Sequence, residues 1–183
     1  MRSVMSRLFL VVALLTLSAC FVSDGLLFTP RNAAYPFGTQ TAYVHYTRES
    51  GPQGAGWTKS YGGKITLGDD RIYTETHRDG DEDISVRFLL YAIGEGYYVA
   101  ADVSELESSK EVYYDLLKVE GKTAYLYGLD CANVPRDDLV ARAITPPDED
   151  GFCVVTSLDG LIRTFKGMLA GGWTASEKYE LGS

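Results

Sequence analysis

The feature that most constrains this chain is a succession of short, alternating segments separated by turn residues. The cleanest alternation runs from Ile84 to Tyr91, where the apolar positions 84, 86, 88 and 90 share one face and Ser85 and Arg87 lie on the other. We predict strands over residues 41–48, 57–67 (one bulged strand or two short ones), 71–77, 84–91, 97–101, 112–119 and 123–129, with a last short strand around 178–181. Parallel neighbours need long crossovers, so strands joined this closely must be antiparallel, in an up-and-down meander.

Near the C-terminus the apolar period changes from two to 3.6 residues. Leu158, Leu161, Ile162, Phe165 and Leu169 then form one stripe, which predicts an amphipathic helix that lies on the sheet. Ser157 is placed to cap the start of this helix, and Gly171 and Gly172 to end it. Residues 135–143 are a second, weaker helix candidate.

This order of elements, a meander followed by a helix and a last strand, resembles lipocalin-like barrels over residues 41–181. The resemblance implies a closed barrel with an interior ligand pocket. The early Gly-x-Trp motif of that family is not met, since Ala55 and Gly56 precede Trp57. A strongly curved open sheet and a sandwich packed by the helix are therefore the alternatives.

The N-terminal segment has the three parts of a secretory signal. Arg2 and Arg7 precede an apolar run from Leu8 to Leu17 that is too short to span a bilayer, and Leu17-Ser18-Ala19-Cys20 follows it. The last four residues resemble the lipobox of bacterial lipoproteins, a family in which the cysteine is lipidated and becomes the mature N-terminus. An ordinary signal-peptidase site and an uncleaved anchor are the alternatives.

The lipobox implies a signal peptide over residues 1–19, a lipidated Cys20 and a location in the bacterial cell envelope. Phe21 stands where some families carry an aspartate that retains lipoproteins at the inner membrane, so the resemblance points to the outer membrane, facing the periplasm. We expect residues 20–40 to be a lipidated tether and residues 41–183 a single β-rich domain. The tether has apolar side chains that could pack, such as Leu26, Phe28 and Phe37.

The charge balance limits the partners of the domain. The chain has a formal charge of −8, and cleavage before Cys20 would remove Arg2 and Arg7 and no acid, which gives −10. So acidic a surface is poorly suited to nucleic acid or to anionic lipid headgroups. We therefore expect contact with the membrane through the N-terminal lipid and no nucleic-acid partner.

Two cysteines remain once Cys20 is assigned to the lipid. In an oxidising periplasm, Cys131 and Cys153 are predicted to form one disulfide. Two cysteines without further ligands at C-x₂-C spacing make a poor metal site. The bond would pin a proline-rich, acidic excursion to the body of the domain.

A search for catalytic motifs gives almost nothing. His45 and His77 are the only histidines, and each is read as a partly exposed structural residue of a strand. The chain has no nucleophile elbow, no zinc helix and no phosphate-binding glycine loop, which favours a protein that is not an enzyme. Hydrolysis by two carboxylates stays open, with no residue to name. We predict no cofactor and no metal.

Acidic residues at every second position, Asp79, Asp81 and Asp83, look like the start of a calcium loop. The remainder of that motif fails, because the sixth position is Ile84 and the twelfth is Leu90. An acidic hairpin tip that keeps the sheet edge soluble explains the same residues.

Tyrosine is the outlier of the composition, with thirteen residues. Six of them define a candidate binding face: Tyr97, Tyr98, Tyr113, Tyr114, Tyr125 and Tyr127. Tyrosine also favours strands, and adjacent residues of a strand point to opposite faces. The sequence thus predicts a lipid-anchored envelope protein that acts as a non-enzymatic binding or interaction module, with a glycan or an envelope protein as partner. A structural or assembly factor, and a lipocalin-like carrier of a small amphipathic ligand, are the alternatives.

Overall fold

A computed structural model describes residues 21–51, 54–147 and 151–182. The strands are β1 (Phe21–Asp24), β2 (Gln40–Gly51), β3 (Gly54–Leu67), β4 (Tyr73–Asp79), β5 (Glu82–Gly94), β6 (Tyr97–Asp102), β7 (Glu111–Glu120), β8 (Thr123–Tyr127), β9 (Cys153–Val154) and β10 (Glu177–Leu181). The helices are α1 (Arg136–Ala141) and α2 (Leu158–Ala170), preceded by a short 3₁₀ turn at Cys131–Asn133. Within these described residues, no helix has the length and apolar character needed to cross a membrane.

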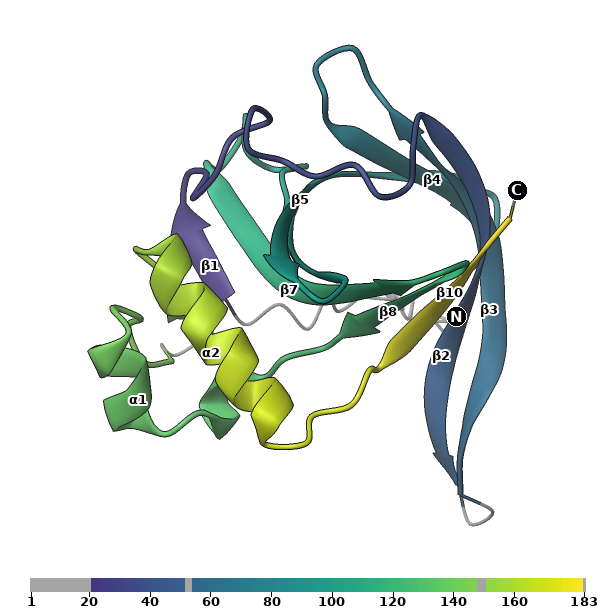
Figure 1. Cartoon of the computed structure of the whole chain (residues 1–183). Coiled ribbons are helices and arrows are strands. Elements are labelled where there is room, and N and C mark those ends of the chain that lie inside the picture. Colours follow the sequence, from purple (N-terminus) through teal and green to yellow (C-terminus); the bar gives the residue numbers. More distant parts are fainter. Residues whose placement is uncertain (1–20, 52–53, 148–150, 183) are drawn as a thin grey trace, which may run out of the picture.

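The fold is mainly β, with a closed barrel of eight antiparallel strands, as the resemblance to lipocalin-like barrels implied. Strands β2 to β8 follow one another in sequence order around the barrel, and β10 closes it between β8 and β2 (Figure 1). The pairing of β6 with β7 runs from Tyr97–Lys118 to Asp102–Tyr113 and leaves no gap in the wall. The open sheet and the sandwich are thereby excluded.

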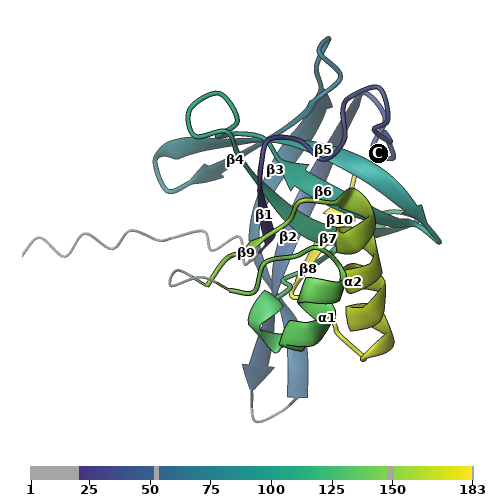
Figure 2. The same cartoon turned by 90° about the vertical axis from the view of Figure 1, so that its left-hand side faces the viewer.

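The two helices and β1 lie together on one side of the barrel (Figures 1 and 2). The predicted helix is present as α2, and the Ser157 hydroxyl caps it by accepting a hydrogen bond from the backbone N–H of Gly160 at 3.3 Å. Its apolar stripe packs against the wall, where the rings of Phe165 and Phe21 meet edge to face at 5.4 Å. Leu161 and Phe165 are fully buried, so this contact forms a dry core outside the barrel.

The predicted tether over residues 20–40 is corrected by the structure. β1 pairs with β7 in antiparallel register and with β9 in parallel register, and Phe21 and Phe28 are buried. The hydroxyl of Tyr114 lies 2.8 Å from the Ser23 hydroxyl and accepts a hydrogen bond from the Leu27 backbone N–H. The apolar residues of this segment are the reason that it packs, since burying them outweighs the entropy of a free tether.

The segment between β1 and β2 helps to close the barrel. Phe37 is 9% exposed and belongs to the interior cluster of side chains. Its backbone N–H donates to the Tyr73 hydroxyl at 3.2 Å, and that hydroxyl donates to the Gly38 carbonyl oxygen at 3.2 Å. Two bonds from a buried ring on β4 therefore hold this segment against the interior.

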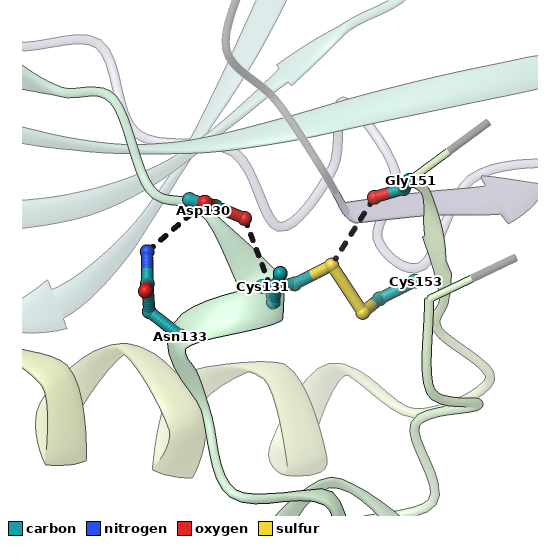
Figure 3. Close-up of a disulfide and its surroundings, with 6 residues drawn as sticks. Asp130, Cys131, Asn133, Gly151 and Cys153 are labelled. Carbon is teal, nitrogen blue, oxygen red and sulfur yellow. Dashed lines mark hydrogen bonds between the residues drawn. A yellow bond between two sulfur atoms is a disulfide. The ribbon is translucent and has the colours of Figure 1, made fainter. Parts of the chain in front are cut away.

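Cys131 and Cys153 form the predicted disulfide, with 6.3 Å between their Cα atoms (Figure 3). The Cys131 sulfur lies 3.5 Å from the carbonyl oxygen of Gly151. Asp130 holds the turn before it, since its carboxylate accepts hydrogen bonds from the Ala132 N–H and the Asn133 side-chain amide, each at 2.9 Å. The bond attaches β9, and the end of the excursion that contains α1, to the side of the barrel where α2 packs.

Candidate functional site

The interior of the barrel contains a cavity of about 90 Å³. Its walls are mostly apolar, with Leu90 on β5, Ala100 on β6 and Leu117 on β7. The complete lining is Phe37, Ile65, Glu75, Val86, Phe88, Leu90, Ala100, Asp102, Asp115, Leu117, Ala124, Leu126, Tyr179 and Leu181. The strand register explains the set, because alternate residues of each strand point inward.

The interior is reachable from solvent near the first half of β5. Ile84, Val86 and Phe88 are the inward face predicted from their alternation, yet each of them is partly exposed. Farther along the same strand, Leu90 is 1% exposed. The apolar face of β5 therefore runs from an accessible mouth to a closed interior.

Asp115 is the polar group of the cavity that stands out. It is 5% exposed, it faces Ala100 across the β6–β7 ladder, and its Oδ1 atom has no hydrogen-bond partner among the described residues. Burial, together with the nearby charges of Glu177 and Asp102, raises the pKa of this carboxyl from 3.8 to about 8. The protonated form of Asp115 is therefore favoured at neutral pH.

A cluster of polar side chains adjoins the cavity. We name this cluster the histidine ladder; it consists of Glu75, His77, Tyr61, His45 and Glu177. The Tyr61 ring stacks on His77 with 4.1 Å between centroids, and its centroid is 4.4 Å from that of His45. Glu75 Oε1 lies 3.2 Å from His77 Nδ1, and Glu177 Oε2 lies 3.0 Å from His45 Nε2. Each histidine thus has its own carboxylate, and one tyrosine ring separates the two pairs.

Two further tyrosines hold these carboxylates in place. Tyr43 donates its hydroxyl to Glu75 Oε1, and Tyr179 donates to Glu177 Oε2 at 2.8 Å. Burial, followed by the charge of the nearby glutamate, raises the pKa of both hydroxyls well above the usual value of 10. Both phenols therefore stay protonated and act as hydrogen-bond donors.

The expectation that the histidines are partly exposed is wrong. His45 is 4% exposed and His77 is 7% exposed, because both lie on the inward face of the closed wall. One ring nitrogen of each, His45 Nδ1 and His77 Nε2, is buried without a hydrogen-bond partner in the described part of the chain. Within that same part, no three His, Cys, Asp or Glu side chains are grouped so that they could hold a metal ion.

The six tyrosines of the predicted binding face do not share one surface. Tyr98 and Tyr113 belong to the inward register of β6 and β7. Tyr97 and Tyr127 lie outside, with ring centroids 6.2 Å apart, and Tyr114 is fully buried under β1. The rings are divided by the alternation of the strands, so they cannot act together.

Tyr125, the sixth ring, contributes to an outer aromatic group with Trp57 at 6.4 Å. The cations Arg48 and Lys178 lie 5.9 and 5.8 Å from the centre of the Trp57 ring. Cations of this chain therefore already lie against the most exposed aromatic face. Another hollow, of about 500 Å³, lies outside the barrel beside α2 and is lined by Ile93, Tyr97 and Leu169 among others.

The acidic tip at Asp79–Asp83 is a hairpin turn. Asp79 pairs with Glu82, and Gly80 adopts a positive φ of 59°. This geometry fits the reading of these acids as a soluble turn between β4 and β5.

No protein-family model matches this chain, and it has no significant match among curated proteins or solved structures.

Proposed function

We propose that this chain is a non-enzymatic binding protein of the bacterial cell envelope, and that its barrel carries a small amphipathic ligand. The observation that carries the proposal is the interior cavity, whose walls are apolar except for a few carboxyl groups and one phenol. An apolar pocket with few polar groups is the usual form of a small-molecule site. Among the described residues, the titratable groups of the lining are Glu75, Asp102, Asp115 and Tyr179.

The size of the cavity limits the ligand. A volume of about 90 Å³ is below the range of roughly 300–1,000 Å³ that is typical of sites for drug-sized molecules. The ligand is then a compact molecule, or one end of a longer molecule whose remainder leaves through the mouth near Val86 and Phe88. Both residues line the cavity and are partly exposed, so an apolar path leads outward from it.

The location of the protein is part of the same proposal. The lipobox at residues 17–20 lies outside the described residues and remains a prediction. If Cys20 is lipidated, the anchor is separated from the barrel by no spacer, because Phe21 is fully buried in β1. The barrel would then lie directly against the membrane, where amphipathic molecules are concentrated.

Native mass spectrometry of the protein purified from its own envelope tests the carrier function. We expect a co-purifying mass that is lost in Ala100→Leu, since Ala100 lines the cavity and a larger side chain would fill it. Ala132→Leu is the matched control, because Ala132 is exposed outside the barrel. Repeated preparations of the wild-type protein without any bound ligand would contradict the proposal.

Membrane anchoring has a separate test. Cys20→Ala should move the protein from the membrane fraction to the soluble periplasmic fraction, and mass spectrometry of the wild-type N-terminus should show a lipidated cysteine. An unmodified wild-type N-terminus would refute the anchor and leave the ligand proposal intact.

One observation favours the alternative function, an assembly factor for an envelope complex. The β2–β3 hairpin extends beyond the barrel, since β10 pairs with β2 only up to Thr47 and β4 pairs with β3 only from Gly63 onward. An unpaired strand edge is a template on which a partner can add a strand. Photocross-linking in intact cells from Thr58, compared with Thr76 on the barrel wall, would detect such a partner at the hairpin alone.

A further inference from the structure

Asp115 is fixed by its strand in a buried position, where an ionised carboxyl group lowers the stability of the fold. Strand β7 is bonded to β6 along the whole of the shared ladder, and next to Asp115 it also pairs with β1 at Tyr114 and with β8 at Leu116. The carboxyl group therefore cannot reach solvent by a movement of the backbone. Burying a carboxyl without a partner lowers stability, and an apolar side chain of similar size would fit the surrounding cavity better.

All the charged side chains that face Asp115 among the described residues are acidic. Glu75 on β4 and Asp102 on β6 also line the cavity, and Glu177 on β10 is close enough to raise the pKa of Asp115. Tyr179 on β10 is the remaining titratable group of the lining. Among the described residues, no lysine or arginine lines the cavity.

The cations of the neighbouring strands point elsewhere. Arg87 contacts Asp70 at 2.5 Å outside the barrel, and Lys118 lies over the outer ring of Tyr97 at 4.9 Å. The histidines are occupied by Glu75 and Glu177. Within residues 21–51, 54–147 and 151–182, the acidic cavity therefore has no lysine or arginine to pair with Asp115.

We propose that the ligand of the barrel carries a primary ammonium group that binds the buried carboxylate of Asp115, while its apolar part lies against Leu90, Leu117 and Leu126. This inference rests on the proposed function, since it names the chemical class of the ligand for the same cavity. An ammonium group donates three hydrogen bonds, so one group can bind the carboxylate of Asp115 and a second acceptor of the lining, such as Asp102 or Glu75.

Binding of the ammonium group to Asp115 also predicts the release of a proton. The raised pKa of Asp115 favours its protonated form at pH 7, whereas the ammonium ion binds the ionised carboxylate. Each binding event at pH 7 therefore forms one ion pair and releases one proton from Asp115 to the buffer. The affinity should rise as the pH increases from 6 toward 8, by up to about tenfold per pH unit.

Three probes that share one butyl chain test the inference: n-butylammonium, n-butanol and n-pentanoate. Their affinities for the purified wild-type protein are measured by titration calorimetry at pH 7, in two buffers of different ionisation enthalpy. We expect n-butylammonium to bind at least about tenfold more tightly than n-butanol and n-pentanoate not to bind. The difference in binding enthalpy between the two buffers should report the released proton.

Asp115→Asn keeps the shape of the side chain and removes its charge. This variant should lose about thirtyfold or more of its affinity for n-butylammonium, lose the proton release and bind n-butanol as the wild type does. Asp81→Asn is the matched control, because it removes the same charge from the exposed tip of the β4–β5 hairpin; it should change none of these values.

The outcomes separate the two proposals. If the three probes bind the wild type with equal affinity and Asp115→Asn changes nothing, the cavity binds apolar ligands and the ammonium inference is overturned. If none of the probes binds the wild type, the proposed function fails, and the inference fails with it.

Discussion

The barrel wall has two buried sides that differ in chemistry. The outer side, where α2 and β1 pack, buries Phe21, Leu161 and Phe165 in an apolar core. The inner side buries His45, His77 and Asp115, and each of these has a ring nitrogen or oxygen without a partner among the described residues. Buried polar groups lower stability when they are unpaired. We conclude that burial of apolar side chains in the outer core offsets the destabilising effect of the unpaired polar groups in the interior. We infer that the interior polar groups serve to bind a ligand.

Truncation of Phe165 should have the largest effect. Phe165→Ala removes a fully buried ring that contacts Phe21, and we expect it to lower the free energy of unfolding by about 3–5 kcal/mol in urea titrations. Val140→Ala is the control and should change it by less than about 0.5 kcal/mol, since Val140 is 60% exposed. Equal effects of the two variants would mean that the outer core does not stabilise the fold.

Loss of the disulfide should have the second-largest effect on stability. Replacing Cys131 and Cys153 with serine removes a cross-link between residues 22 positions apart, which should cost about 3 kcal/mol. Affinity for interior ligands should not change, because the bond lies on the helix side of the wall. A loss of binding at temperatures where the variant is folded would show that the two sides are coupled.

Two glycine-to-alanine variants distinguish the two sides directly. A Cβ atom at Gly160 would meet the Arg142 carbonyl oxygen outside the barrel, and one at Gly63 would meet the Tyr43 ring and the Thr76 carbonyl oxygen inside it. Each variant should lose about 1–3 kcal/mol of stability. Only Gly63→Ala should shift the NMR signals of the His77 ring, because Tyr43 shares Glu75 with it.

Asp115→Asn should raise stability instead of lowering it. The pKa of Asp115 is raised in the folded state from 3.8 to about 8, so the folded protein keeps a proton that the unfolded chain has lost between these values. The free energy of unfolding should therefore fall as the pH rises from about 4 to 8. Asp115→Asn should abolish this part of the pH dependence, which amounts to up to about 1.4 kcal/mol per pH unit, and should be more stable than the wild type at pH 8. A wild-type protein that is more stable at pH 8 than at pH 5, with an unchanged slope in the variant, would contradict this account.

Much of the architecture could be predicted from local patterns. The alternation of β5, the cap at Ser157 and the turn residues between strands specified the strand order and α2. The packing of residues 21–40 was missed because the partners of Phe21 and Phe28 lie far away in sequence, and no local period reveals such packing. Closure of the barrel also depends on the distant pairing of β10 with β2.

The site was mostly missed, although one part of it could have been found. A two-residue turn at Gly80–Asp81 places His77 opposite Ile84 and Glu75 opposite Val86. These two polar residues of β4 therefore point inward, to the same side of the sheet as the apolar face of β5. Such reasoning depends on the exact residues of the turn, as the β7–β8 turn shows. The strands predicted over residues 112–119 and 123–129 leave three residues for this turn, but Glu120 pairs with Thr123 and the turn is Gly121–Lys122. Asp115, an acid within the apolar run of β7, was the remaining signal.

NMR mapping of bound n-butylammonium tests the central claim most directly. On titration of the wild-type protein, we predict that the shifted backbone amides cluster at inward positions of β5, β6 and β7, around Leu90, Ala100 and Asp115, and that the amides of α2 stay in place. Shifts that gather instead along α2 near Leu169, or around Trp57 on the outer wall, would contradict a binding site inside the barrel.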